Sequence, residues 1–363
     1  MTPKKYAITL ILLLGLFFAG NLVIWYGYNG QSFHGFDGHG DLLRLGNIRP
    51  VPSETEQHHY GKFFTRFQDY LTSGSTETFD FLTIGDSFSN DGGGEPYQGV
   101  LTQEYHAKVL NLRFEKYDVV SLCKMLSDLG YFDRLGTKVV ILECVERNIQ
   151  PIYGDHYLEF IPYTGDPFQT DFLQANPPTP TAAPTRRQLF PGYMVKTNAL
   201  LLDTKRQLRN HPYRVSDTTD VVSLTSDVFT PKGREHSLIF YHEDLLYLQR
   251  PVNVEMVNAN LNHLAAILRE KGIRLVFLPA PDKFDVYYPQ LPEEWKAQWP
   301  ENPFFDEMLA AQKDYIFIDS KKLLRAAVAN GEQDVYWSDD THWSWKAHQI
   351  LSAEIMRQLE AGD

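Results

Sequence analysis

Short apolar runs alternate with longer amphipathic segments along most of the chain after residue 78. Each run is flanked by turn residues or by a helical pattern, and such runs predict β-strands. The runs are Phe79–Ile84, Lys108–Leu112, Lys138–Cys144, Arg274–Leu278 and Tyr315–Asp319.

Apolar residues recur at helical spacing in four segments between or after these runs, at 118–129, 252–271, 319–329 and 344–360. Strands that alternate with helices favour a parallel sheet covered by helices on both faces. We therefore expect an α/β domain of three layers (α/β/α) at 76–363.

The alternation is interrupted at about 150–245, which we interpret as an insertion in this domain. Residues 175–184 form a Pro/Thr/Ala linker that cannot pack as a helix or a central strand. A basic stretch follows at 186–214. It is either an ordinary solvated surface or a surface for anionic headgroups or an anionic polymer.

The first 30 residues have a different character. Lys4 and Lys5 precede an apolar run from Tyr6 to Tyr28, which is long enough to span a bilayer. Basic residues ahead of the run favour a cytoplasmic N-terminus. We expect a single-pass anchor at 1–30 in the cytoplasmic (inner) membrane, a lead-in at 31–75, and the main domain in the periplasm or outside. A cleaved signal peptide is the alternative.

Net charge and cysteine content argue against some partners and some kinds of site. The formal net charge of −12 argues against nucleic acid as a partner, because an acidic surface repels phosphate. Cys123 and Cys144 form no CxxC pair, which argues against a zinc or thioredoxin-like site. They are either two buried thiols or one disulfide.

Thr83–Ser89, with the sequence TIGDSFS, directly follows the first predicted strand. A serine at the carboxyl end of a parallel strand lies where such folds bind their ligands. Gly85 permits a tight turn, and the backbone N–H of Ser87 can then point into a pocket. By itself, the motif is also compatible with an ordinary strand-to-helix turn in which Asp86 or Ser87 caps the helix.

Trp337–Trp345, with the sequence WSDDTHWSW, immediately precedes the last predicted helix. An aspartate two or three residues before a histidine can accept a hydrogen bond from one imidazole nitrogen. The other nitrogen is then free to take a proton from a serine. Asp340 and Asp339 both have suitable spacing from His342. Alone, this motif is also compatible with a capped helix start.

Taken together, the early Gly-Asp-Ser and the late Asp-x-His resemble the SGNH hydrolases. The chain is similar, over about 79–360, to the alginate O-acetyltransferase-like (AlgX/AlgJ) and DHHW branch of that group. The segments that carry the resemblance are Gly85–Ser89, Glu143–Asn148, Pro279–Tyr287 and Asp340–Trp343.

The resemblance implies a serine-dependent acyl transfer that uses no metal and no organic cofactor. Ser87 matches the nucleophile, His342 the base and Asp340 the acid of Asp-x-His-Trp, while Asp339 fits the wider SGNH spacing and is a rival for Asp340. Family members acetylate exopolysaccharide, or resemble proteins that do. They commonly work beside a membrane-bound O-acyltransferase that supplies the acyl group.

Further residues are candidates for binding. The oxyanion donors are the backbone N–H of Ser87 and, as a substitute for missing motifs, Asn111. Arg147 either contacts substrate or pairs with Glu143 or Glu146. Lys283 and Tyr287 either bind substrate or cap a loop. Trp343 either binds a sugar ring or is buried.

One departure from the alginate enzymes concerns order. There the Asp-His motif precedes the serine, whereas here the serine comes first, as in peptidoglycan O-acetyltransferases and ordinary esterases of the group.

The predicted function is extracytoplasmic O-acyl (O-acetyl) transfer to a cell-envelope or exported polysaccharide. The alternatives are an esterase with the same triad, and a non-catalytic polysaccharide-binding or assembly subunit.

Overall fold

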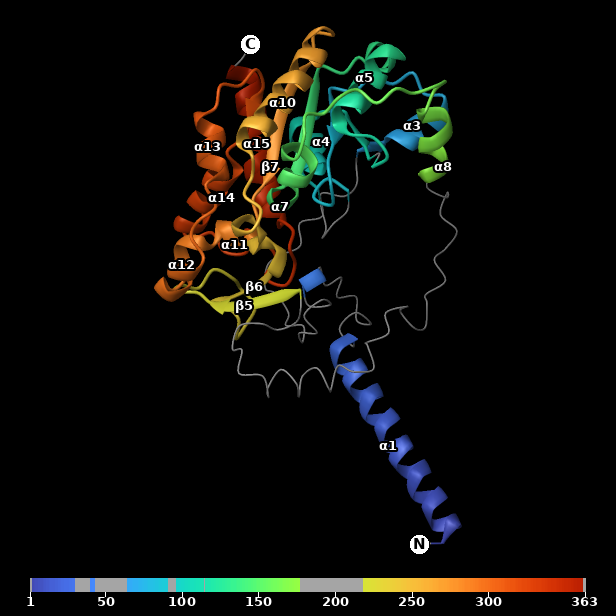
Figure 1. Cartoon of the computed structure of the whole chain (residues 1–363), viewed down its shortest axis with the longest axis vertical. Coiled ribbons are helices and arrows are strands. Elements are labelled where there is room, and N and C mark those ends of the chain that lie inside the picture. Colours follow the sequence, from blue (N-terminus) through green and yellow to red (C-terminus); the bar gives the residue numbers. More distant parts are fainter. Residues whose placement is uncertain are drawn as a thin grey trace.

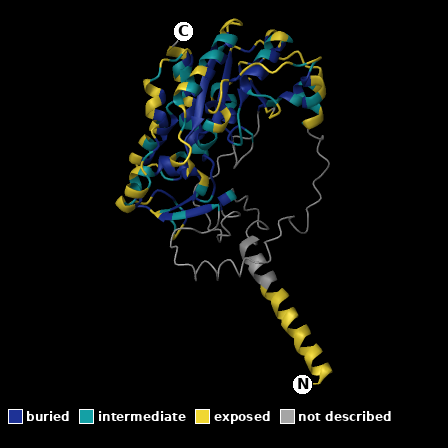
Figure 2. Ribbon diagram, viewed as in Figure 1, coloured by how far each residue is buried: buried dark blue, intermediate teal, exposed yellow. Residues whose placement is uncertain are grey.

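A computed structural model describes residues 2–29, 40–42, 64–90, 96–113, 115–176 and 218–361 (Figure 1). The first element is the helix α1 (Pro3–Asn29), which projects away from the remaining elements. Residues 2–20 of this segment are exposed along their whole length (Figure 2). Among the described helices, α1 is the one long and apolar enough to cross a membrane, as an anchor or a signal sequence would be.

A six-stranded parallel sheet forms the centre of the main domain. Its strands lie in the order β1-β3-β2-β4-β7-β8, and every neighbouring pair is parallel. The strands are β1 (Thr65–Arg66), β2 (Phe81–Ile84), β3 (Val109–Leu112), β4 (Val139–Val145), β7 (Arg274–Ala280) and β8 (Ile316–Phe317).

Alternate residues of the central strands enter two separate apolar cores, one on each face of the sheet. In β4, Val140 and Leu142 join one core, while Val139 and Ile141 join the other. The two cores are closed by helices, so both faces are covered and the strands read as continuous apolar runs. The predicted α/β class with a parallel sheet and helices on both faces is confirmed.

Helices of both layers are short to medium in length. The first core is covered mainly by α5 (Val119–Asp128) and α10 (Val254–Arg269), and the second by α4 (Tyr97–Tyr105), α14 (Ser320–Ala329) and α15 (Trp345–Ala361). The other α-helices of the described residues are α3 (Phe67–Ser73), α6 (Tyr131–Leu135), α7 (Glu146–Ile149), α8 (Leu173–Ala175), α11 (Lys283–Val286), α12 (Glu293–Gln298) and α13 (Phe304–Ala310). Short π- or 3-10 helices accompany them: η2 (Gln150–Gly154), η3 (Phe168–Phe172), η4 (His242–Leu248) and η5 (Tyr288–Gln290).

The predicted strands and helices are found within a few residues of their expected ends. The sequence analysis did not predict β1, α4 or the small antiparallel hairpin of β5 (Thr219–Ser223) and β6 (Ser237–Tyr241), which falls in the expected insertion. The basic stretch 186–214 and most of the Pro/Thr/Ala linker lie outside the described residues. Cys123 and Cys144 are buried free thiols.

Candidate active site

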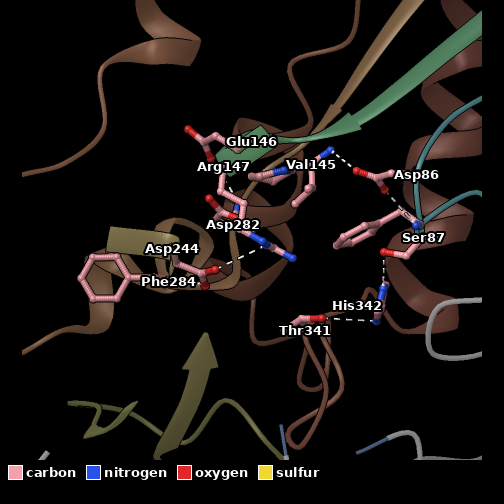
Figure 3. Close-up of polar contacts among 12 residues, drawn as sticks. Asp86, Ser87, Val145, Glu146, Arg147, Asp244, Asp282, Phe284, Thr341 and His342 are labelled. Carbon is pink, nitrogen blue, oxygen red and sulfur yellow. Dashed lines mark hydrogen bonds and ion pairs between the residues drawn. The ribbon is translucent and has the colours of Figure 1, made fainter. Parts of the chain in front are cut away.

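A tight turn, Gly85–Asn90, directly follows β2 at the carboxyl edge of the sheet. Asp86 fastens the turn: its Oδ1 accepts a hydrogen bond from Phe88 N (3.1 Å), and its Oδ2 accepts one from Val145 N (2.9 Å) at the end of β4 (Figure 3). Asn90 Nδ2 donates to the carbonyl oxygens of Gly85 and Asp86, both at 2.7 Å. These bonds hold the half-buried Ser87 in one place.

Glu143 lies beneath this turn, with its side chain buried in β4. Its Oε2 accepts hydrogen bonds from Asp86 N (3.1 Å) and Ser89 Oγ (2.8 Å). Burial, and then the negative charge of Asp86, raise the pKa of Glu143 well above its ordinary value. A Cβ at Gly85 would lie 2.4 Å from both Glu143 Oε2 and Ser89 Oγ, so the close approach requires glycine there.

The segment before α15 reaches the same edge of the sheet and brings His342 to Ser87. Ser87 Oγ donates to His342 Nε2 at 2.8 Å, and His342 Nδ1 lies 2.5 Å from Asp340 Oδ1. Because a carboxylate only accepts, Nδ1 carries the hydrogen and Nε2 is left to accept from the serine. Phe88 packs against the imidazole, with ring centroids 4.7 Å apart. Such an arrangement can activate a serine hydroxyl as a nucleophile.

Asp340 is buried and remains ionised. Burial opposes the charge, but hydrogen bonds from the side chain and backbone of His342 lower the pKa of Asp340 to about 2. Asp339 is half-buried, and among the described contacts none joins it to His342. Burial, and then the charge of Asp340, raise the pKa of Asp339 to about 6. The structure therefore places Asp340, not Asp339, on the imidazole.

Comparison with known families finds one match, at residues 234–362, to the family described as SGNH hydrolase-like domain, acetyltransferase AlgX. These residues are similar to an AlgX-type SGNH hydrolase-like domain. The match includes Asp340 and His342, whereas Ser87 precedes it. No curated protein matches the chain. The resemblance predicted from the motifs is thus confirmed for this part of the chain.

Within the AlgX-like domain, Lys283 holds the loop that carries Asp340. Its buried Nζ donates to the carbonyl oxygens of Trp337 (2.7 Å), Ser338 (3.0 Å) and Asp340 (3.1 Å). Burial lowers the pKa of Lys283 to about 8, against the opposing effect of nearby carboxylates. All three ammonium hydrogens have protein partners, so the expectation that Lys283 contacts substrate is wrong, and it is a loop cap.

Tyr287 and Trp343 are also buried in the AlgX-like domain. The hydroxyl of Tyr287 accepts a hydrogen bond from Tyr336 N (3.2 Å), and Trp343 Nε1 donates to the hydroxyl of Tyr336 (2.7 Å). Trp343 also packs edge-on against Phe88, with ring centroids 4.9 Å apart. Neither ring presents a face to a sugar, which corrects the expectation of substrate contact for both.

Arg147 follows β4 and is 13% exposed. It pairs with neither Glu143 nor Glu146: its Nη1 lies 2.6 Å from Asp282 Oδ1 and 3.4 Å from Asp244 Oδ1 (Figure 3). The expected pairing partners were therefore wrong. Arg147 lines a cavity of about 210 Å³ beside the carboxyl ends of β4 and β7. Substrate contact by Arg147 stays a prediction.

Asn111 belongs to the network that supports the serine turn. Its Oδ1 accepts from Thr83 Oγ1 (2.8 Å), and its Nδ2 donates to Asn90 Oδ1 (2.7 Å). The side chain is nearly buried, at 6% exposure. Asn111 thus holds Asn90, and among the described hydrogen bonds none joins its side chain to Ser87.

Among the residues that the structure describes, two groups of side chains are close enough to share a metal ion: Asp41, Asp340 and His342, and the buried set Glu146, Asp282 and Asp285. In the first group, the 2.5 Å between Nδ1 and Oδ1 is a hydrogen-bond distance, which leaves no space for an ion between the two atoms. In the second, Asp282 pairs with Arg147, and the charge of Lys321 acts on the other two carboxyls.

Sequence reasoning missed three residues that shape the site. Glu143 was quoted as part of a motif but given no role beside Ser87; an acidic residue inside the otherwise apolar strand β4 was the available signal. Asn90 follows the Gly-Asp-Ser-Phe-Ser motif and was overlooked. Asp41 contacts the Asp-His segment, and nothing in its local pattern pointed to that contact.

Proposed function

We propose that the protein is an extracytoplasmic, serine-dependent O-acyl transferase that acetylates a cell-envelope or exported polysaccharide through an acyl-serine intermediate. The observation that carries this proposal is the hydrogen-bonded series from Ser87 Oγ through His342 to Asp340. The match to an AlgX-type acetyltransferase domain supports transfer as the reaction class.

In the first step, Ser87 Oγ attacks the carbonyl carbon of an acetyl ester while His342 Nε2 takes the hydroxyl proton. The tetrahedral oxyanion then collapses, and the bond to the leaving alkoxide breaks. His342 returns the proton to that alkoxide, which departs as an alcohol and leaves acetyl-Ser87. Asp340 keeps the imidazole in the required tautomer and stabilises its positive charge.

In the second step, a sugar hydroxyl attacks the acetyl-serine. His342 takes the proton of that hydroxyl, the new ester bond forms, and the bond to Ser87 Oγ breaks. The proton then returns to Oγ, so the enzyme is regenerated. Water in place of the sugar would give net ester hydrolysis by the same steps.

The backbone N–H of Ser87 is the oxyanion donor that we propose. Within the described residues it has no hydrogen-bond acceptor. A backbone donor at this position is fixed by the turn and needs no rearrangement during the reaction. Asn111 stays a second candidate, because its amide nitrogen donates one of its two hydrogens to Asn90.

The proposed location follows from α1. With Lys4 and Lys5 on the cytoplasmic side, α1 would be a single-pass anchor in the inner membrane and the AlgX-like domain would face the periplasm or the exterior. We further propose that a membrane-bound O-acyltransferase supplies the acyl group. Protease added to spheroplasts should digest the domain; protection until lysis would contradict this orientation.

The intermediate provides the test of the chemistry. The full-length chain in detergent is mixed with an activated acetyl ester, quenched, and analysed by peptide mass spectrometry. We expect one acetyl group on the peptide that contains Ser87. In Ser87→Ala the acetyl-peptide should be absent and turnover should fall by roughly 10⁴ or more, with an almost unchanged thermal midpoint. Turnover within about tenfold of wild type would remove Ser87 from the mechanism.

Adding acceptor oligosaccharides separates transfer from hydrolysis. A transferase should acetylate the sugar and release less acetate as the sugar concentration rises. Acetate release that no tested sugar alters would favour the esterase alternative. Sugar binding without any acetyl-Ser87 would favour a non-catalytic subunit.

A further inference from the structure

Asp41 contacts the Asp-Thr-His segment from a distant part of the chain. Its Oδ1 accepts from Thr341 N (2.8 Å), and its Oδ2 accepts from Thr341 Oγ1 (2.6 Å). In return, the backbone N–H of Asp41 donates to Asp340 Oδ2 (3.1 Å). Asp41 thus binds both residues that precede His342.

The contact with Asp340 supplies a partner for the second carboxylate oxygen. Asp340 Oδ1 already accepts from His342 Nδ1 and, at 2.9 Å, from His342 N. With Oδ2 bound to Asp41 N, rotation of the carboxylate would break hydrogen bonds on both sides. The orientation that presents Oδ1 to the imidazole is therefore held from two directions.

The carboxylate of Asp41 also acts on His342 more directly. Its Oδ2 lies 3.8 Å from His342 Nδ1, and Thr341 Oγ1, which it binds, lies 3.3 Å from the same nitrogen (Figure 3 shows the Thr341–His342 contact). Burial, and then the charge of Asp340, raise the pKa of Asp41, whereas the hydrogen bonds from Thr341 lower it. Two carboxylates thus face one edge of the imidazole.

The neighbours of Asp41 are docked as well. The backbone N–H of Gly40 bonds to the carboxyl of Asp339. Leu42 has no exposed surface and packs against Ile239 of β6, with Val221 and Tyr241 beside them. Three consecutive residues therefore join the hairpin β5–β6 to the loop that carries the triad acid.

We propose that Asp41 is a positioning residue of the site, which acts through Asp340 and Thr341 to hold His342 for proton transfer with Ser87. The proposal rests on the proposed role of Ser87 as nucleophile. A merely structural role would tie down the segment without changing the reactivity of the serine, so reactivity is the quantity to measure.

The experiment follows the rate at which a fluorophosphonate probe labels Ser87 in the full-length chain in detergent. In Asp41→Ala we expect the maximal labelling rate to fall by about 10²-fold, as a misplacement of about 1 Å would cause, with an unchanged half-saturating probe concentration. Asp41→Asn keeps an oxygen that accepts from Thr341 but loses the charge, so its rate should lie between those of Asp41→Ala and wild type.

Asp118→Ala is the matched control. The carboxylate of Asp118 also accepts from both the N–H (2.9 Å) and the hydroxyl (2.8 Å) of one residue, Ser121, but at the start of α5. Both alanine variants should lower the thermal midpoint, and only Asp41→Ala should slow labelling.

The two proposals fail in different ways. If Asp41→Ala were labelled at the same rate as Asp118→Ala, the proposed role of Asp41 would be wrong, and the proposed function would be unaffected. Wild-type labelling of Ser87 without acyl transfer to any sugar would count against the transferase and leave the Asp41 comparison intact. A wild-type chain that the probe does not label at Ser87 would overturn both.

Discussion

His342 Nδ1 lies 2.5 Å from Asp340 Oδ1, although the preceding residue, Asp339, also has a suitable spacing from the histidine. The relationship has a structural cause. The backbone N–H of His342 also donates to Asp340 Oδ1, at 2.9 Å, so the loop closes on Asp340. Asp339 instead bonds to the backbone of Gly40 and experiences the charge of Lys283.

The two aspartates should therefore differ in mutagenesis. Asp340→Asn should present the wrong imidazole tautomer and lower turnover with an activated acetyl ester by roughly 10⁴. Asp339→Asn should keep turnover within about tenfold, because the hydrogen bond that defines the tautomer remains. Steady-state assays of both full-length variants decide the matter. If Asp339→Asn were the inactive variant, Asp340 would lose its place as the triad acid.

Gly85 should not tolerate alanine. The new Cβ would lie 2.4 Å from Glu143 Oε2, beneath a turn that is hydrogen-bonded on every side. We expect Gly85→Ala to lower the free energy of unfolding by about 1–3 kcal/mol, as overpacking does, and to displace Ser87 enough to lower turnover. Denaturant unfolding and the acetyl ester assay measure the two effects.

Gly154→Ala is the control for that substitution. Its Cβ would meet the end of the Gln150 side chain, which is flexible and is held by exposed hydrogen bonds with Asn253 and Asp155. We expect a cost below about 1 kcal/mol and normal turnover. Equal stability losses at 85 and 154 would show that the turn adapts and that glycine is not required.

Lys283→Met should lower both stability and turnover strongly, although the two side chains are similar in size. It would leave three loop carbonyls without their donor, and we expect a loss of about 3 kcal/mol or more together with lower turnover. Lys313→Met is matched, because the ammonium group of Lys313 also donates to three carbonyls, but at the partly exposed end of α13. Its loss should be below about 1 kcal/mol. Comparable losses would contradict the clamping role of Lys283.

Glu143 should make the free energy of unfolding decrease as the pH rises above the ordinary pKa of a glutamate. A carboxyl with a raised pKa binds its proton more tightly in the folded state. Its contribution is complete below the pKa of the unfolded state and is lost as the pH rises through the folded-state pKa. Glu143→Gln cannot ionise and keeps an oxygen that accepts from Asp86 N and Ser89 Oγ.

Thermal midpoints measured from acidic to alkaline pH test this expectation. The midpoint of wild type should fall more steeply toward alkaline pH than that of Glu143→Gln, while other buried carboxyls contribute equally to both curves. The exposed Glu270, at the end of α10, provides a control variant, Glu270→Gln, that should follow wild type. Parallel curves for all three chains would show that Glu143 does not titrate in this range.

The sheet and the meeting of Ser87 with His342 were predictable because both depend on local patterns. Apolar runs define the parallel strands, and the two motifs stand at ends of elements that a parallel sheet brings to one edge. Burial of Lys283 was not predictable, since a lysine after a strand reads as exposed until its carbonyl partners are known. Asp41 was harder still, because its partner Asp340 lies 299 positions away.

The docking of Asp41 also limits where the serine can be. Asp41 comes twelve residues after Asn29, the last residue of α1, and at about 3.3–3.6 Å per residue the intervening chain reaches at most about 43 Å, whatever path it takes. That reach is comparable to the full thickness of a bilayer, whose hydrocarbon core is about 30 Å thick. If α1 is the membrane anchor that we propose, the site that carries Asp41 stays within this distance of the lipid surface. Under the proposed function, a polymer would then have to pass close to that surface to be acetylated, and strands in distant layers of the envelope would be out of range.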